Sequence, residues 1–162
     1  MATCDPATLL ASASCFSCLS KGQLELLRVQ LLCEIYNASG GGSNEVEVAI
    51  ACSDETSDLA AAAAVATFRM PFAMTVTGVR ASVTTAPAGS SIEVDINESG
   101  ASILSTVISI DAGATTSTTS ATPPVISDSA LADDAEIKVD IDQIGSGTAG
   151  AGLKITMIGT RV

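Results

Sequence analysis

Residues 91–97, SIEVDIN, and residues 136–144, EIKVDIDQI, alternate apolar and polar side chains along the chain. This alternation is typical of a β-strand that buries one face and exposes the other to water. The side chains predicted to point inward are Ile92, Val94 and Ile96 in the first stretch and Ile137, Val139 and Ile141 in the second. The two stretches therefore predict a β-sheet domain with a core of β-branched side chains.

Further strand-like runs surround these two stretches. They cover residues 45–52, 72–84, 102–110 and 153–161. Turn residues, among them Pro87, Gly89, Ser99 and Gly100, separate several of them, and Gly78 interrupts the alternation in a way that predicts a β-bulge. Short strands separated by turns are typical of antiparallel β domains. We expect a mainly β fold, with an antiparallel β-sandwich or jelly-roll-like domain over residues 68–162.

Three segments allow more than one interpretation or resemble a motif. Residues 59–66 are an alanine run that favours a helix by propensity, although an extended segment packed in a subunit interface fits equally. Residues 115–122 are rich in Thr and Ser and run into two prolines, which confine any strand there to a sheet edge. Residues 145–152 are rich in glycine but precede a strand, whereas a dinucleotide-binding loop requires a helix, so we expect a hairpin connection.

The N-terminal part has a helical pattern instead. A short helix is expected over residues 5–13, and a longer one begins at Ser20 and ends near Asn37, before a glycine linker. Its apolar positions follow helical spacing at Leu24, Leu27, Leu31 and Ile35. Such a helix is not stable alone, so these side chains form either the core of a small bundle or a docking surface.

The predicted organisation has three parts. Residues 1–37 are a helical, Cys-rich attachment region. Residues 38–67 hold a linker, a strand and the alanine-rich segment, and residues 68–162 are the β domain. Aromatic residues make up only 2% of the chain, so the core is thin and we expect oligomer contacts to supplement it.

Composition excludes several classes of function. The net charge is −11, which disfavours binding to nucleic acid or to an anionic membrane surface. The sequence has no histidine, which removes Ser-His and Cys-His catalysis and most catalytic zinc sites. We see neither a secretory signal nor an apolar run long enough to span a bilayer, and we expect synthesis in a cytosol. The chain is not expected to be an enzyme or to bind a cofactor.

Paired carboxylates occur at Asp140 and Asp142 and at Glu93 and Asp95. Each pair has the two-residue spacing that places both side chains on one exposed strand face. A solvated face is the ordinary interpretation, and a weak calcium site that also uses Asp133 and Asp134 is the functional one. We expect no metal site here.

All the cysteines lie within the first 52 residues, at Cys4, Cys15, Cys18, Cys33 and Cys52. Three interpretations remain open: buried small hydrophobic side chains, a Cys-only metal or iron–sulfur site, and disulfides within the head or to a neighbouring chain. An odd count argues against purely intrachain pairing. Cys52 ends a strand beyond the linker, so it is either a core cysteine or a separate bridge.

Two long segments resemble proteins of tailed bacteriophages. The head, CDPATLLASASCFSCLSKGQLELLRVQLLCEI, resembles a Cys-rich module at the N-terminus of small virion proteins. The segments MPFAMTVTGVRASVTTAPAGSSIEVDINESGASILST and ISDSALADDAEIKVDIDQIGSGTAGAGLKITMIGT resemble a β-sandwich module of phage tail fibres. Such fibres are typically homotrimers with an N-terminal attachment region, so the resemblance implies attachment through Cys15, Cys18 and Cys33.

The resemblance leads to a specific hypothesis. The chain is expected to be a trimeric tail fibre in the phage virion, made in the host cytoplasm. Its N-terminal helices would attach to the baseplate or another tail protein, with disulfides securing the joint, and the β domain would face a receptor on the host surface. The alternative is a capsid decoration or cement protein.

Overall fold

The computed structural model describes residues 44–162, which form one unit by their internal contacts. Within this range the chain is mainly β, and its paired strands run antiparallel. The strands are β1 (Glu45–Ala51), β2 (Ala62–Arg69), β3 (Met74–Ser82), β4 (Ile92–Glu98), β5 (Ala101–Ser102), β6 (Leu104–Thr106), β7 (Ile108–Ile110), β8 (Val125–Ile126), β9 (Ala130–Leu131), β10 (Glu136–Gln143) and β11 (Lys154–Arg161). A single 3-10 turn, η2 (Ser117–Thr119), interrupts the described strands.

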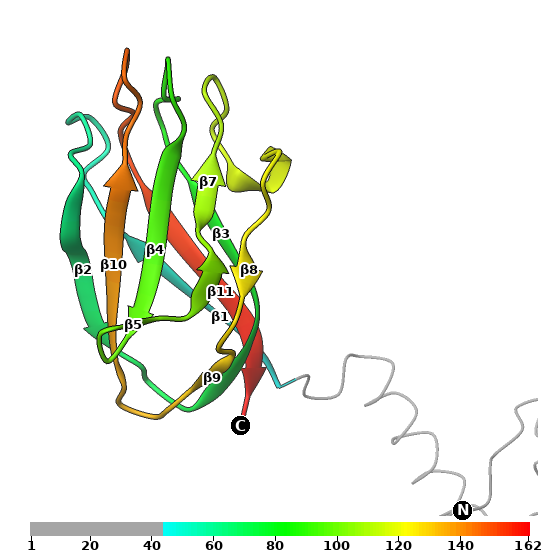
Figure 1. Ribbon diagram of the computed structural model, residues 1–162. Coiled ribbons are helices and arrows are strands. Elements are labelled where there is room, and N and C mark those ends of the chain that lie inside the picture. The colour runs from blue at the N-terminus through cyan, green and yellow to red at the C-terminus, as the bar shows by residue number, and fades with distance from the viewer. Residues whose placement is uncertain (1–43) are drawn as a thin grey trace, which may run out of the picture. The chain divides into compact units, whose positions relative to one another are not determined.

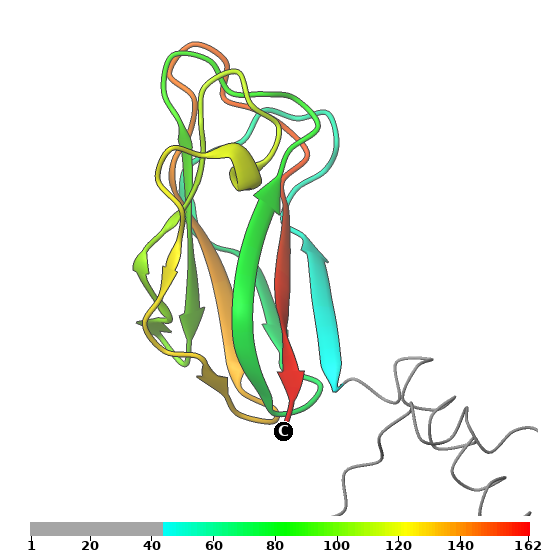
Figure 2. The same cartoon turned by 90° about the vertical axis from the view of Figure 1, so that its right-hand side faces the viewer.

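The long strands form two sheets, which Figure 2 shows edge-on as two layers. The first sheet has the strand order β1-β11-β3-β9, and the second has the order β2-β10-β4-β5, with β7 also paired to β4. Strands β6 and β8 form a separate two-stranded ribbon. β1, β3 and β11 lie in the first sheet, whereas β2, β4 and β10 lie in the second, so β11 and β10 each pair with strands distant in sequence (Figure 1).

Both sheets contribute to one hydrophobic core, as the alternating pattern predicts. Ile92, Val94 and Ile96 are fully buried on β4, and Ile137 is fully buried on β10. The first sheet supplies Met74, Val76, Val79, Ala81, Ile155 and Met157 to the same cluster. Burying one such side chain stabilises a fold by about 1.5–3 kcal/mol relative to leaving it exposed. The core therefore depends on many aliphatic side chains rather than on a few large aromatic ones.

Two local predictions in the sheet region are confirmed. The register between β3 and β11 shifts where Ile158 faces Gly78 and Gly159 faces Val76, so β3 has one extra residue beside Gly78. Ser99 and Gly100 both have positive φ, of 51° and 90°, and join β4 to β5. Positive φ at both central residues is the geometry of a two-residue hairpin turn.

The alanine run adopts the extended alternative. Its second half is in β2, which pairs with β10, so tertiary pairing overrides the helix propensity of alanine. β1 and β2 are thus integral to the same unit as residues 68–162. The unit begins at Asn44, before the boundary at residue 68 that composition suggests.

For residues 115–122 the sequence left the structure open, and for residues 145–152 the expectation is wrong. Residues 115–122 form no strand, because the chain folds into η2 and buries Ser117, whose Oγ accepts a 2.8 Å hydrogen bond from Ala81 N. Residues 145–152 are not a hairpin connection. They lead from β10 in one sheet to β11 in the other, because each of these strands already has two neighbours in its own sheet.

The expectations for the N-terminal region lie outside the described residues. These are the two helices within residues 5–37, the apolar positions Leu24, Leu27, Leu31 and Ile35, and the cysteines Cys4, Cys15, Cys18 and Cys33.

Candidate functional site

The β unit has two different ends. At one end, β1 begins beside the end of β11, where Arg161 N donates a 2.7 Å hydrogen bond to Asn44 O. The opposite end gathers the long connections 52–61, 83–91, 111–124 and 144–153, seen at the top of Figure 1. We call this second end the loop end. The chain therefore enters the β unit at the end far from its long loops.

Backbone hydrogen bonds join the loops of the loop end to one another. Ala88 N donates to Thr148 O at 2.9 Å, Gly147 N donates to Ala88 O at 2.8 Å, and Leu59 N donates to Gly150 O at 2.8 Å. These bonds satisfy amides that have no partner in a sheet. The loop end is consequently a fixed surface rather than a set of independent loops.

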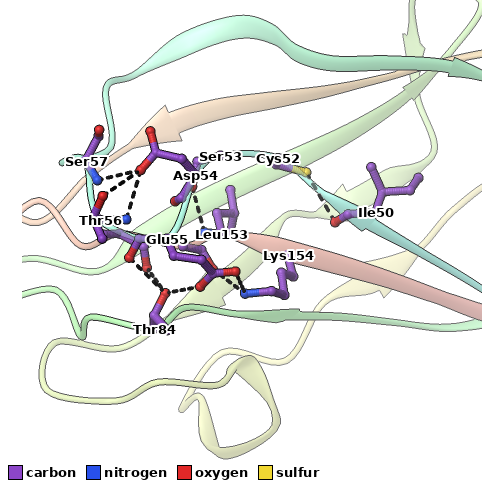
Figure 3. Close-up of polar contacts among 12 residues, drawn as sticks. Ile50, Cys52, Ser53, Asp54, Glu55, Thr56, Ser57, Thr84, Leu153 and Lys154 are labelled. Atoms are coloured by element: carbon purple, nitrogen blue, oxygen red, sulfur yellow. Dashed lines mark hydrogen bonds and ion pairs between the residues drawn. The ribbon is translucent and has the colours of Figure 1, made fainter.

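A polar cluster, drawn in Figure 3, ties three of these segments together. The Lys154 ammonium lies 2.6 Å from Glu55 Oε1, and Thr84 Oγ1 donates a 2.8 Å hydrogen bond to Glu55 Oε2. Glu55 follows β1, Thr84 follows β3 and Lys154 begins β11. The ammonium and the hydroxyl lower the pKa of the Glu55 carboxyl. The carboxylate thus acts as a clamp between three segments that are distant in sequence.

The turn that carries Glu55 is ordered by its own side chains. Asp54 Oδ1 accepts hydrogen bonds from Ser57 N at 2.6 Å and from Thr56 N at 2.8 Å (Figure 3). These two amides lower the pKa of Asp54 to about 2. Ser53 Oγ accepts a 2.9 Å bond from Leu153 N, which fixes the turn to the start of β11. An aspartate that caps its own turn is a common loop motif.

Gly152 makes room for the cluster. Its φ is +73°, and a Cβ at this position would contact the Thr84 side chain and Glu55 Oε2. A side chain here would therefore displace the clamp as well as strain the backbone.

The hydrogen bonds of this cluster join segments of the loop end. The Asp54 carboxylate accepts bonds from two amides of its own turn, and the Glu55 carboxylate contacts Thr84 and Lys154. Within residues 44–162, no group of three or more Cys, Asp or Glu side chains is placed to hold a metal ion. The arrangement positions the loops relative to one another.

The predicted carboxylate pairs come together on the outer face of the second sheet. Asp140 faces Asp95 across the β10–β4 pairing, and Asp142 lies at a bulge next to them. Partial desolvation raises the pKa of the mostly exposed Asp142, with further contributions from the negative charges of Asp95, Asp140 and Glu93.

Two of these carboxylates have structural partners. Asp140 accepts hydrogen bonds from Ala64 N and Asn97 Nδ2, and Asp95 accepts a 2.6 Å bond from Ser102 Oγ. Asp133 and Asp134 lie in the turn before β10, about the length of a strand from Asp142. The carboxylates that the sequence suggested as calcium ligands therefore lie at two different ends of β10.

Cys52 directly follows β1 and is only 8% exposed. Its thiol is free and lies 3.8 Å from Ile50 O (Figure 3). Burial raises its pKa to about 11. This environment is that of a core side chain, one of the two roles that the sequence leaves open.

Sequence reasoning missed the clamp at the loop end. The run Asp54-Glu55-Thr56-Ser57 predicts a turn but does not indicate that Glu55 meets Lys154. No local signal links these residues, because the contact depends on how β1, β3 and β11 pair.

Comparison with known proteins gives no relative: no family model, no curated protein and no solved structure matches this chain. None of the helices in the described part of the chain is both long and apolar enough to cross a membrane.

Proposed function

We propose that this chain is a structural virion protein of a tailed phage, a trimeric tail fibre attached through its N-terminal region. The baseplate or a neighbouring tail protein is the attachment partner, and the β unit faces the host surface. The resemblance of the two long sequence segments to phage proteins is the origin of this proposal.

The proposal rests on one observation: residue 44 and the long loops lie at opposite ends of the β unit. Residue 44 enters at the end opposite the loop end, so a unit tethered through its N-terminal side presents its loops outward. The loops are fixed to one another by backbone bonds and by the Glu55 clamp. A rigid, outward set of loops on a β scaffold is a common arrangement for a binding surface.

We further infer that the two sheets form an antiparallel β-sandwich with a jelly-roll-like arrangement. The shared hydrophobic cluster and the alternating burial of β4 and β10 support this inference.

The N-terminal cysteines Cys4, Cys15, Cys18 and Cys33 are proposed to secure the attachment as disulfides after the particle is released. Since Cys52 is buried in the β unit, it is left out of this set. Four remaining thiols permit pairing within the head or between chains.

The experiment uses purified particles of the phage that encodes the chain. Antibody-gold labelling and quantitative mass spectrometry should place the chain on the tail at on the order of tens of copies, in a multiple of three as closed symmetry requires. On a non-reducing gel it should migrate as a multimer or joined to a tail protein. On the order of hundreds of copies on the head would instead indicate a capsid decoration protein. Absence from the particles would overturn both proposals.

A further inference from the structure

Strands β1 and β2 lie at the outer edges of the two sheets, and each has one side without a strand partner among residues 44–162. An unpaired strand edge is a template on which a second chain can add a strand. Proteins protect such edges with charged residues, prolines, very short strands or bulges. β1 carries exposed Glu45 and Glu47. β2 has neither a charge nor a proline between Ala62 and Phe68, so its protection must have another source.

A distortion in β2 provides that protection. Val139 of β10 faces Ala66, but Ile141 faces Ala62, so β2 contains extra residues between the two pairs. Ala64 lies within this bulge and has a φ of +53°, which an alanine rarely adopts. The edge of β2 is thereby bent in the middle of its uncharged segment.

Asp140 holds this distortion in place. Its Oδ1 accepts a 2.6 Å hydrogen bond from Ala64 N, and its Oδ2 accepts a 3.1 Å bond from Asn97 Nδ2 on β4. The carboxylate thus reaches from β10 to both neighbouring strands, which Figure 1 shows on either side of β10. A carboxylate that accepts a backbone N–H forms a strong, charge-assisted bond, which offsets the strain at Ala64.

We propose that Asp140 is a positioning residue that keeps the alanine-rich edge of β2 bent, and so prevents β2 from pairing with β2 of a second copy of this chain. Without the carboxylate, Ala64 relaxes to an extended φ. β2 then offers a straight, uncharged edge, and the identical edge of another copy is its natural antiparallel partner. This device acts in addition to any assembly through the N-terminal region.

The test compares full-length variants with the wild-type chain under reducing conditions, using sedimentation velocity at several concentrations. Asp140→Ala should form assemblies larger than those of the wild type, with a size that grows with concentration. Asp140→Asn keeps one oxygen that can accept from Ala64 N but loses the charge and the bond from Asn97 Nδ2, so its assemblies should be intermediate in size between those of the wild type and of Asp140→Ala. Asp142→Asn removes a charge from the same strand with no bond to β2, and it should leave the assembly size unchanged.

Two double variants separate edge pairing from general destabilisation. Adding Ala64→Gly to Asp140→Ala removes the alanine strain and should restore part of the wild-type behaviour. Adding Ala63→Lys places a charge on the exposed edge and should abolish the extra assembly, because a charged edge resists pairing. If Asp140→Ala proves insoluble, the assembly size of the double variant Asp140→Ala/Ala63→Lys is measured instead. A double variant with the wild-type assembly size supports the proposal, and an insoluble double variant overturns it.

Hydrogen exchange gives an independent readout in the wild-type chain. The Ala64 amide should exchange at least about tenfold more slowly than that of exposed Ala63, since only the former is bonded to a carboxylate. Equal exchange rates at Ala64 and Ala63 would overturn the proposal, as would an unchanged assembly size in Asp140→Ala.

Discussion

Glu55 and Lys154 form an ion pair of 2.6 Å that joins the turn after β1 to the first residue of β11. Thr84, at the end of β3, donates to the other oxygen of the same carboxylate. β11 pairs with both β1 and β3, so the clamp closes the loop end of one sheet across its three long strands. Both charged side chains remain substantially exposed, at 54% and 44%. Solvent therefore screens the pair, and its main role is to position the loops.

A double-mutant cycle with Glu55→Gln and Lys154→Met should give a small coupling free energy at low salt that disappears in concentrated salt, because the pair is exposed. The matched control is Glu136 and Lys138, a 2.8 Å pair of two β10 side chains, although Glu136 also lies 4.0 Å from Arg69 of β2. Urea unfolding measures both cycles. Amide hydrogen exchange in residues 53–58 should also be faster in the Glu55 and Lys154 variants than in the wild type. It should be unchanged in the Glu136 and Lys138 variants. A coupling that persists in high salt would contradict this account.

The pH dependence of the Glu55 contribution follows from its lowered pKa. Since the folded pKa lies below the unfolded value of 4.5, the stabilisation is complete above that value and is lost as the pH falls through the folded pKa. Glu55→Gln should therefore reduce stability at neutral pH and have no effect in strong acid.

Gly152→Ala should be more destabilising than Gly113→Ala. Both glycines have positive φ, of 73° and 82°, but a Cβ at Gly113 would meet nothing within 4 Å. Gly113→Ala therefore reports backbone strain alone, about 1–2 kcal/mol. Gly152→Ala adds displacement of Thr84 and Glu55, and should cost roughly 1 kcal/mol more. Thermal unfolding of both variants checks the order, and equal losses would show that the clamp tolerates a methyl group.

Asp142→Asn should stabilise the protein at neutral pH. The pKa of Asp142 is raised, so its ionised form is disfavoured in the folded chain. The variant removes this penalty above the folded pKa, and its advantage should vanish as the pH falls below the unfolded value of 3.8. The gain is roughly a few tenths of a kcal/mol, because the side chain is exposed and screened. Urea unfolding between pH 3 and pH 7 (about the range over which carboxylates titrate) measures the gain, and Asp133→Asn is the control that removes a charge outside the carboxylate group.

Cys52 should react slowly with iodoacetamide in the folded chain. Its raised pKa of about 11 leaves little thiolate at pH 8 (about the unperturbed thiol pKa), and its side chain is buried. Brief labelling followed by peptide mass spectrometry should leave the Cys52 peptide unmodified until denaturant is added. Rapid labelling without denaturant would contradict the buried position. Recovery of Cys52 in a disulfide-linked peptide would assign it to the bridge role instead.

Local pattern was sufficient for much of the sheet. The alternation of β4 and β10 predicted which side chains are buried, because a strand places successive side chains on opposite faces. Gly78 and the Ser99–Gly100 pair predicted a bulge and a turn for equally local reasons, steric freedom and positive φ.

The local sequence pattern did not determine the secondary structure of the alanine run or of residues 115–122. Alanine favours a helix when only its own backbone is considered, but β10 offers β2 antiparallel strand pairing on either side of the bulge. Residues 115–122 turn instead of extending because Ser117 bonds to Ala81 from a distant strand. In both segments the deciding partner lies far away in the sequence.

By itself, then, the sequence determined a mainly β unit, its inward side chains and the absence of histidine chemistry, since composition and periodicity are local properties. Only the tertiary structure decided that Glu55 meets Lys154, that Asp140 reaches Ala64, and that Cys52 is buried. The physical reason is that each of these environments is created by strand pairing or packing between distant segments. A hydrophobic pattern fixes which face of a strand is buried, but it does not specify which strand lies beside it.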